Sequence, residues 1–215
     1  MTYLIAETSE VYQGQFGEFT ITKADRIGVI IYRSALFIAA LCFAIGTIAV
    51  IWQGSQSMVL GSLTPLYGLF CAALGISLLT IHIYMASLHR ALQLFWLIGC
   101  FAALWLAFQS SGPLALTIYN HPATLIGIGF TFAALTGIFI KEAFCFNRLE
   151  AKLLTPVIPF LLLGHWLGWL TVQTEQVLLV TWAVLFLVFA LRKAIQPIPP
   201  DIGDKTVFAY LQGQH

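Results

Sequence analysis

Charged residues are scarce in this sequence. Asp, Glu, Lys and Arg make up only 9% of the 215 residues, whereas hydrophobic residues make up 60% and the mean hydropathy is +0.90. A soluble globular domain carries about 25% charged residues. Too little polar surface is available to cover a water-soluble fold. We therefore expect an all-α, polytopic integral membrane protein with a single membrane domain.

Other absences narrow the function. The net charge of +1 gives no basic surface for a nucleic acid. The four cysteines include no C-x-x-C pair, so the sequence does not support a zinc or dithiol site, and we expect no metal. The first 33 residues contain four acidic residues and no short apolar stretch with a cleavage site. We therefore expect no secretory signal, and the first span should stay in the mature protein.

Long segments contain no Asp, Glu, Lys or Arg, and they define the expected spans. These segments are residues 34–89, 91–140, 153–174 and 176–191. A helix that crosses the hydrocarbon core needs roughly 20 apolar residues, so the first two segments hold two spans each and the last two hold one each. The predicted spans are residues 34–52, 64–85, 91–108, 121–140, 154–171 and 176–191. This gives a cytoplasmic tail (1–33), a six-helix transmembrane domain (34–192) and a second cytoplasmic tail (193–215).

The positive charges predict the orientation. With six spans, every Lys and Arg falls on the same side as the two termini, namely Lys23, Arg26, Arg33, Arg90, Lys141, Arg148, Lys152, Arg192, Lys193 and Lys205. Glu175 is the only formal charge on the other side. Cytoplasmic loops are enriched in Lys and Arg. We therefore predict that both termini lie in the cytoplasm (N-in/C-in).

Several connections can be read from the sequence. Residues 86–90 are predicted to form a tight turn between the second and third spans, and Pro122 to lie in the first turn of the fourth. Residues 114–119 are apolar and suit the membrane interface. For residues 11–22 we expect an irregular tail on the membrane surface. A small β-hairpin is the alternative, although an isolated hairpin is only marginally stable.

No acidic or basic residue falls inside a predicted span. Ion-coupled transporters usually need such groups, so this function is disfavoured, although the carbonyl groups of broken helices can also bind ions. Small residues recur at Gly129, Ala133 and Gly137, and again at Gly164 and Gly168. They predict close helix packing within the bundle, with an oligomer interface as the alternative.

The histidines raise the question of a haem. At a rise of about 1.5 Å per residue, His82 and His165 differ in depth by roughly 12 Å, which is too far to ligate one iron. A single axial ligand for chlorophyll or haem remains an alternative at His165, where Gly164 and Gly168 leave room. The expected role of His165 is otherwise a hydrogen bond within the bundle, with no cofactor.

The loop after the fourth span mixes both charge signs with aromatic residues. Its charged residues are Lys141, Glu142, Arg148, Glu150 and Lys152. We interpret them as an intrachain ion-pair cluster that locks the cytoplasmic face, or alternatively as a docking surface for a partner. No nucleophile–base pair is apparent, so we predict no catalytic residue and no enzymatic activity.

One short motif occurs twice. Residues 63–65 and 154–156 both read Leu-Thr-Pro, at the starts of the second and fifth predicted spans. Because these spans run in opposite directions, the match is a weak indication of the inverted repeats found in transporters.

Residues 127–168 carry the segment KEAFCF followed by LTPVIPFLLLGH. This stretch resembles a family of cyanobacterial integral membrane proteins of unknown function. The resemblance implies a photosynthetic bacterial host and therefore a thylakoid or plasma membrane. It implies no activity and no catalytic residues.

Three functions are therefore considered. The favoured one is a non-enzymatic auxiliary protein that assists the assembly or stability of a membrane complex, photosynthetic if the resemblance holds, with the lipid bilayer and other membrane subunits as partners. The second is a permease for a small, neutral solute. It requires a polar cavity near the midplane, lined by Ser77, Thr80, Thr131, Thr136 and His165. The third is a carrier of one pigment or haem on His165.

Overall fold

The computed structural model describes residues 10–54 and 56–213, and nearly all of them are helical. The strands are β1 (Val11–Gly14) and β2 (Gly17–Thr20). The long helices are α1 (Lys23–Gln53), α2 (Ser57–Thr80), α3 (Ala86–Gln109), α5 (Leu125–Phe146), α6 (Leu149–Trp166) and α7 (Val172–Ala194). The short helices are α4 (Leu114–Asn120), the 3-10 turn η1 (Pro122–Thr124), α8 (Pro199–Ile202) and α9 (Lys205–Gly213).

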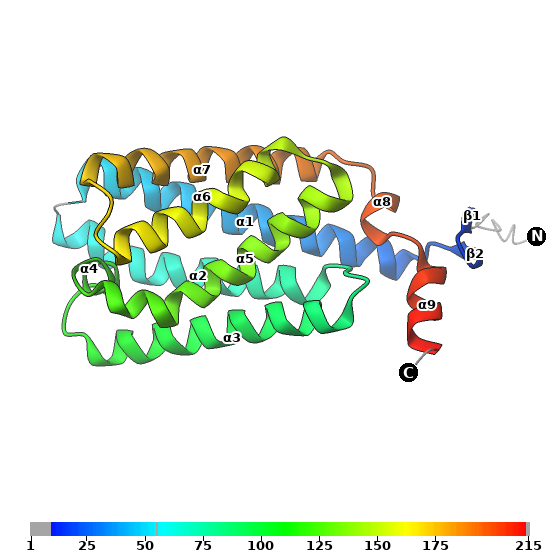
Figure 1. The fold of residues 1–215 in the computed structure, drawn as a ribbon, viewed down its shortest axis with the longest axis horizontal. Helices are drawn as coiled ribbons and strands as arrows, with labels where there is room; N and C mark the ends of the chain where they lie inside the picture. Colours follow the sequence, from blue (N-terminus) through cyan, green and yellow to red (C-terminus); the bar gives the residue numbers. More distant parts are fainter. Residues whose placement is uncertain (1–9, 55, 214–215) are drawn as a thin grey trace, which may run out of the picture.

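The six long helices run antiparallel along one axis, each returning beside an earlier one (Figure 1). Helix α1 packs against α2 and α7, α3 packs against α2 and α5, and α6 packs against α5 and α7. These contacts close the six helices into a ring around one apolar core, which includes Leu36, Leu74, Ile138, Leu154 and Phe186. The hairpin, α8 and α9 lie at one end of the ring and α4 lies at the other (Figure 1).

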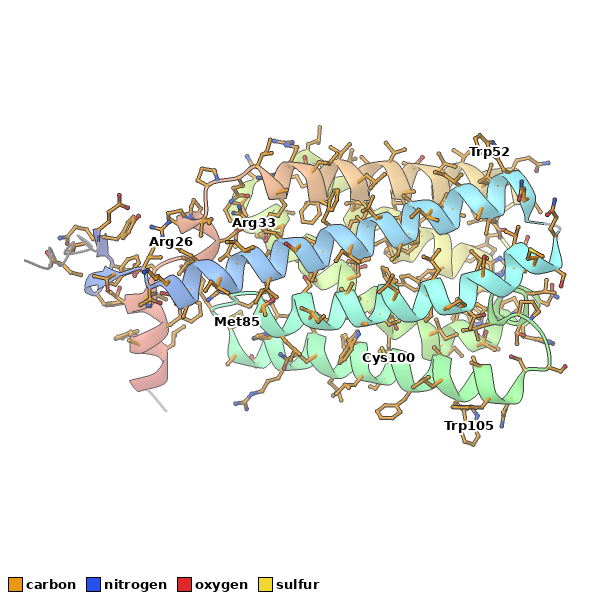
Figure 2. All side chains as sticks on the ribbon, turned by 180° about the vertical axis from the view of Figure 1, so that it is seen from behind. Arg26, Arg33, Trp52, Met85, Cys100 and Trp105 are labelled. Carbon is orange, nitrogen blue, oxygen red and sulfur yellow. The ribbon has the colours of Figure 1, made fainter. Side chains whose placement is uncertain are left out.

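The outer surface of the ring is apolar, as a membrane requires. On α3, the side chains of Phe101, Trp105 and Phe108 are 68%, 66% and 87% exposed. Figure 2 shows Trp105 pointing away from the bundle. A soluble monomer rarely exposes so continuous an apolar surface, whereas lipid chains tolerate it.

Five segments are long and apolar enough to cross a membrane. They are α1, α2, α3, residues 122–146 and α7. Helix α6 is shorter, contains Pro156 and Pro159, and carries Glu150 and Lys152 near its start. The chain is thus a multi-pass helical bundle.

The N-terminal segment differs from the expected irregular tail, because β1 and β2 form an antiparallel hairpin in which Val11 pairs with Thr20. The hairpin is not isolated. The ring of Phe16 stacks on that of Tyr210 in α9 at 4.1 Å, and the backbone N–H of Gln15 donates to Asp204 Oδ2 at 2.6 Å. The sequence around the hairpin gave no sign of this C-terminal partner, which supplies the support that a lone hairpin lacks.

One predicted connection was also wrong. Residues 86–90 do not form a turn, because α3 begins at Ala86 and residues 81–85 make the connection. At this connection His89 Nε2 lies 2.6 Å from the carbonyl oxygen of Leu78, and it hydrogen-bonds to this group near the end of α2. Helix α1 begins at Lys23, well before residue 34, because Thr22 and Asp25 form a reciprocal capping box. Pro122 opens η1, as predicted.

The contact between α3 and α5 is close at Gly99. A Cβ atom at Gly99 would lie 2.4 Å from the backbone nitrogen of Thr131. We predict that Gly99→Ala lowers the free energy of unfolding by about 2 kcal/mol, because the two backbones must separate. Thermal unfolding of the purified protein in detergent measures this loss.

Gly68→Ala is the matched control. Among the described residues, nothing lies within 4 Å of a Cβ atom at Gly68, so this variant should stay within about 0.5 kcal/mol of the wild type. Equal unfolding midpoints for the two variants would contradict the predicted close contact.

Candidate functional site: a buried ion network

Positive charge gathers at the end of the bundle that carries the hairpin. All ten Lys and Arg residues lie within the described ranges, in or beside the hairpin, the 81–85 connection, the α5–α6 turn and the C-terminal segment. Figure 2 shows Arg26 and Arg33 at this end and Trp52 at the other. We call this end of the bundle the basic end.

Five charged side chains are buried inside the basic end. One is Glu150, which is 4% exposed. The other four contact one another, and we call them the ion network. They are Arg33 of α1, Glu142 of α5, Lys193 of α7 and Asp201 of α8, with exposed fractions of 8%, 0%, 0% and 4%. The predicted spans contain no charged residue, yet the interior of the bundle beyond them is charged. The charged residues lie just beyond the predicted spans, but the helices continue past those limits.

Lys193 is the centre of the ion network. Its Nζ lies 2.5 Å from Glu142 Oε2 and also pairs with Asp201 Oδ1. Arg33 holds the other oxygen of Asp201, with Nη2 at 2.6 Å and Nε at 2.8 Å from Oδ2. Two cations therefore face two carboxylates, and the four charges balance.

Further groups complete the hydrogen bonding of the ion network. Glu142 Oε1 accepts from the hydroxyl of Tyr32 at 3.2 Å and from Lys141 Nζ at 2.9 Å. Arg33 donates to the backbone carbonyls of Gln196 and Pro197. The ammonium of Lys193 also lies 4.1 Å from the centre of the Phe146 ring, at a distance typical of a cation–π contact. Buried charges are tolerated when they are paired and hydrogen-bonded in this way.

The loop residues singled out in the sequence lie around the ion network. Glu150 pairs with Arg192 at 2.6 Å and with Arg148 at 3.5 Å. Lys141 pairs with Glu142, whereas Lys152 donates to the side chain of Asn147, which ends α5 in a left-handed conformation. Four of the five residues thus enter ion pairs.

Sequence reasoning missed the partners of these residues. Arg33, Lys193 and Asp201 lie on other elements, and Arg33 is more than 100 positions from Glu142. One feature of the sequence could have indicated a partner. Asp201 is an acidic residue in the C-terminal tail, directly after two prolines, in a chain with few charges. If the tail turns back after the prolines, it brings this carboxylate to the ends of the helices.

The C-terminal segment fastens the hairpin to the 81–85 connection. The hydroxyl of Tyr84 accepts the backbone N–H of Asp204 at 2.6 Å, and Lys205 Nζ lies 2.9 Å from Asp25 Oδ2. Hydrogen bonds from the Thr206 side chain and then from the Gln15 backbone lower the pKa of Asp204 below its ordinary value. Both ends of the described chain therefore meet at the basic end.

His165 lies at the opposite end of the bundle, not near the midplane as predicted. Helix α6 starts at Leu149 and ends at Trp166, which shifts His165 into its last turn. Its Nδ1 lies 2.6 Å from Glu175 Oε1, and its Nε2 lies 3.2 Å from the backbone oxygen of Tyr119. Both ring nitrogens are engaged, so ligation of a haem or chlorophyll would require breaking one of these contacts.

The polar residues named for a permease do not converge on one cavity. Thr131 hydrogen-bonds with the hydroxyl of Tyr67 at 3.1 Å. Thr80 and Thr136 bond to carbonyls of their own helices. Ser77 is buried in the core, and His165 lies at the end of the bundle.

The ion network generates a stability prediction. Lys193→Met should lower the free energy of unfolding by about 3–5 kcal/mol, because it leaves two buried carboxylates with one cation fewer. The double variant Glu142→Gln/Lys193→Met should lose less than the sum of the two single variants, since Arg33 and Asp201 remain paired. Denaturation of the purified protein in detergent measures the four corners of this cycle.

Arg192→Met is the control, one residue away on the same helix. The side chain of Arg192 is 54% exposed, and its buried partner Glu150 keeps Arg148 as a second cation at 3.5 Å. The loss should therefore be smaller than for Lys193→Met, because solvent screens the charge of Arg192. Additive losses in the cycle, or equal losses for the Arg192 and Lys193 variants, would show that burial of the ion network does not stabilise the fold.

Comparison with known proteins agrees with this architecture. Residues 76–210 match the model of a family described as uncharacterized integral membrane proteins, DUF2301. An uncharacterized protein of Haemophilus influenzae is 29% identical over 186 residues, which cover 86% of this chain and 91% of the relative. No solved structure matches.

The Haemophilus relative corrects one expectation. The resemblance suggested a cyanobacterial family, but the family is not specifically cyanobacterial. The family match covers helices α3, α5, α6 and α7 in full, together with most of the residues of the ion network. The chain belongs to the DUF2301 family of integral membrane proteins.

Proposed function

We propose that the protein crosses the membrane six times, with the basic end in the cytoplasm. The contact between the hairpin and α9 supports an even number of crossings, because it brings both ends of the described chain to one side. Five segments meet the criteria for a span, so α6 is needed as the sixth. Its 18 residues extend over about 27 Å, close to the thickness of the hydrocarbon core.

The proposed location is the plasma membrane. The thylakoid expectation rested on the cyanobacterial resemblance, and the Haemophilus relative removes that basis. The accumulation of Lys and Arg at one end supports placing that end in the cytoplasm.

The proposed role is that of a non-enzymatic auxiliary protein, which presents a preformed cytoplasmic surface to another membrane subunit. One observation carries this proposal: large apolar side chains are exposed beside the ion network. Phe144, Leu149 and Ile195 are 85%, 66% and 84% exposed, and we call them the apolar rim. Exposed apolar groups bordered by charged ones are typical of protein interfaces.

The ion pairs and hydrogen bonds next to the ion network support the same proposal by holding the base of this surface. Arg148 and Arg192 tie the start of α6 to the end of α7 through Glu150 and Gln196. A surface that is already organised loses less entropy on binding. Within the described residues, both oxygens of Glu142 and of Asp201 already accept donors, which disfavours a catalytic role. The engaged nitrogens of His165 favour a protein without a bound pigment.

The orientation is tested with the exposed thiol of Cys145, at the end of α5. In intact bacterial cells a membrane-impermeant maleimide should leave Cys145 unlabelled, and permeabilisation should expose it. A cysteine introduced by Met58→Cys, at an 87% exposed position at the other end of the bundle, should be labelled without permeabilisation. Labelling of both positions from the same side would overturn the six-span topology.

The auxiliary role is tested by native electrophoresis of membranes solubilised in a mild detergent. The wild-type protein should migrate in a complex larger than its own monomer or dimer. Phe144→Ser/Ile195→Ser should shift it to the size of the free protein, because the apolar rim is lost. Met58→Ser, which removes an equally exposed apolar side chain at the opposite end, should leave the complex intact. A wild-type protein that always migrates alone would contradict the proposal.

A further inference from the structure

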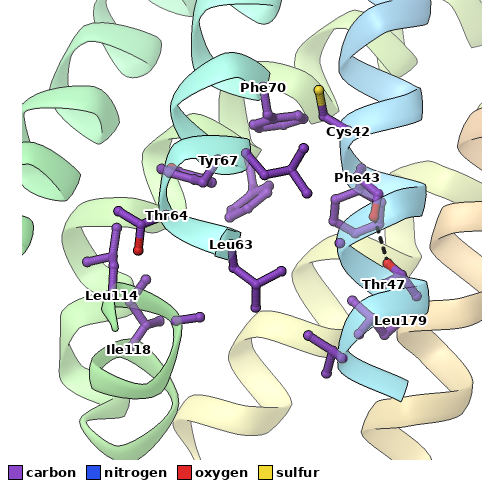
Figure 3. Close-up of a pocket in the computed structure, with 15 residues that line it drawn as sticks. Cys42, Phe43, Thr47, Leu63, Thr64, Tyr67, Phe70, Leu114, Ile118 and Leu179 are labelled. Atoms are coloured by element: carbon purple, nitrogen blue, oxygen red, sulfur yellow. Dashed lines mark hydrogen bonds between the residues drawn. The ribbon is translucent and has the colours of Figure 1, made fainter. Parts of the chain in front are cut away.

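A half-open pocket of about 180 Å³ lies between the helices, in the half of the bundle away from the ion network. Its walls come from the second half of α1, the first half of α2, helix α4, Phe132 of α5 and Leu179 of α7. Figure 3 shows Leu63 of α2 between Leu114 and Ile118 of α4 on one side and Phe43 of α1 and Leu179 of α7 on the other.

The walls of the pocket are apolar and rich in aromatic rings. Phe43, Tyr67, Phe70 and Phe132 contribute rings with centroids 5.9–6.4 Å apart in successive pairs. The described lining contains no charged side chain. A charged ligand would lose its hydration there without compensation, whereas an aromatic ring could pack against these walls with favourable edge or offset geometry.

One polar group in the pocket has no partner. Thr47 donates to the carbonyl oxygen of Phe43 in its own helix, and the hydroxyl of Tyr67 is bonded to Thr131. Thr64 lines the same space, and within the described part of the chain its hydroxyl makes no hydrogen bond. A ligand with one hydroxyl or carbonyl group could bond to it.

The pocket is closed toward the basic end. Trp182, which is 1% exposed, lies against Phe43 at 4.3 Å and against Phe132 at 5.2 Å between ring centroids. Phe139, Phe186 and Phe189 pack edge to face farther along the same helices, and the ion network follows them. This arrangement suits a site that holds a molecule rather than a path through the bundle.

We propose that this pocket binds a neutral molecule about the size of one substituted benzene ring, oriented by a hydrogen bond to Thr64. The volume supports this class, since an apolar protein cavity of about 150 Å³ binds benzene. Helix α4 forms one wall through Leu114, which is 4% exposed. This site is separate from the proposed docking surface and does not depend on it.

The test uses a photoreactive probe, a benzyl alcohol carrying a diazirine on the ring, with the full-length protein in detergent. After illumination, peptide mass spectrometry should place the label on residues 42–50, 63–70 or 114–118. Benzyl alcohol should compete for the site, and benzylammonium, which carries a charge, should not. Label spread evenly over lipid-facing positions and insensitive to benzyl alcohol would overturn the proposal.

Two glycines provide a matched pair of variants. A side chain at Gly46 points toward the pocket, where a Cβ atom would meet Leu66 at 3.4 Å and Leu63 at 3.7 Å, both ordinary contacts. Gly46→Leu should therefore abolish specific labelling. Gly61→Leu should leave it unchanged, since among the described residues nothing lies within 4 Å of a Cβ atom there. Undiminished labelling of a folded Gly46→Leu protein would exclude the pocket as the site.

A third variant tests the role of Thr64 and avoids any change in packing. Thr64→Val keeps the shape of the side chain and should weaken competition by benzyl alcohol about 5-fold, while competition by toluene should not change. Equal weakening for both competitors would contradict the hydrogen bond. A photoreactive fatty acid that labels the same peptides, and is displaced by oleate but not by benzyl alcohol, would assign the pocket to a lipid chain instead.

Discussion

The fold depends on the compensation of one buried ammonium group. Lys193 is fully buried and is shared by Glu142 and Asp201. An unpaired charge at this depth would be strongly destabilising. The requirement to pair Lys193 explains why α5 continues to Glu142, why α8 turns back under the bundle, and why Arg33 balances the second carboxylate. Four elements that are distant in the sequence are thereby joined at one end.

The same end determines how the rest of the chain is arranged. Because α8 must deliver Asp201 to Arg33 and Lys193, the C-terminal segment emerges beside the start of α1. Helix α9 then lies against the hairpin through Phe16 and Tyr210, and the hairpin gains a support that its own two strands cannot provide. The proposed docking surface borders this locked region, whereas the proposed ligand pocket lies beyond the aromatic layer.

The bundle is therefore layered along its axis. Paired charges occupy the basic end, aromatic rings packed edge to face occupy the middle, and a small apolar pocket occupies the far half. His165 and Glu175 pair at the outer end, next to Tyr119. The polar residues that a permease cavity would need do not converge, because Thr80 and Thr136 bond to their own helices and Thr131 bonds to Tyr67.

The sequence by itself determined the membrane class, the positions of the main helices and the gathering of Lys and Arg at one end, because hydropathy and charge are properties of each residue in order. Only the tertiary structure decided which charges are paired, where His165 lies, and that Gln15 and Phe16 meet the C-terminal helix. These features depend on contacts between different elements. Gln15 with Asp204, Tyr32 with Glu142 and Arg33 with Asp201 are each more than 100 positions apart. Two helices also extend beyond the predicted spans. The capping box at Thr22 stabilises the first turns of α1, and the pairing of Glu142 stabilises the last turns of α5. Hydropathy alone excludes these turns from a span.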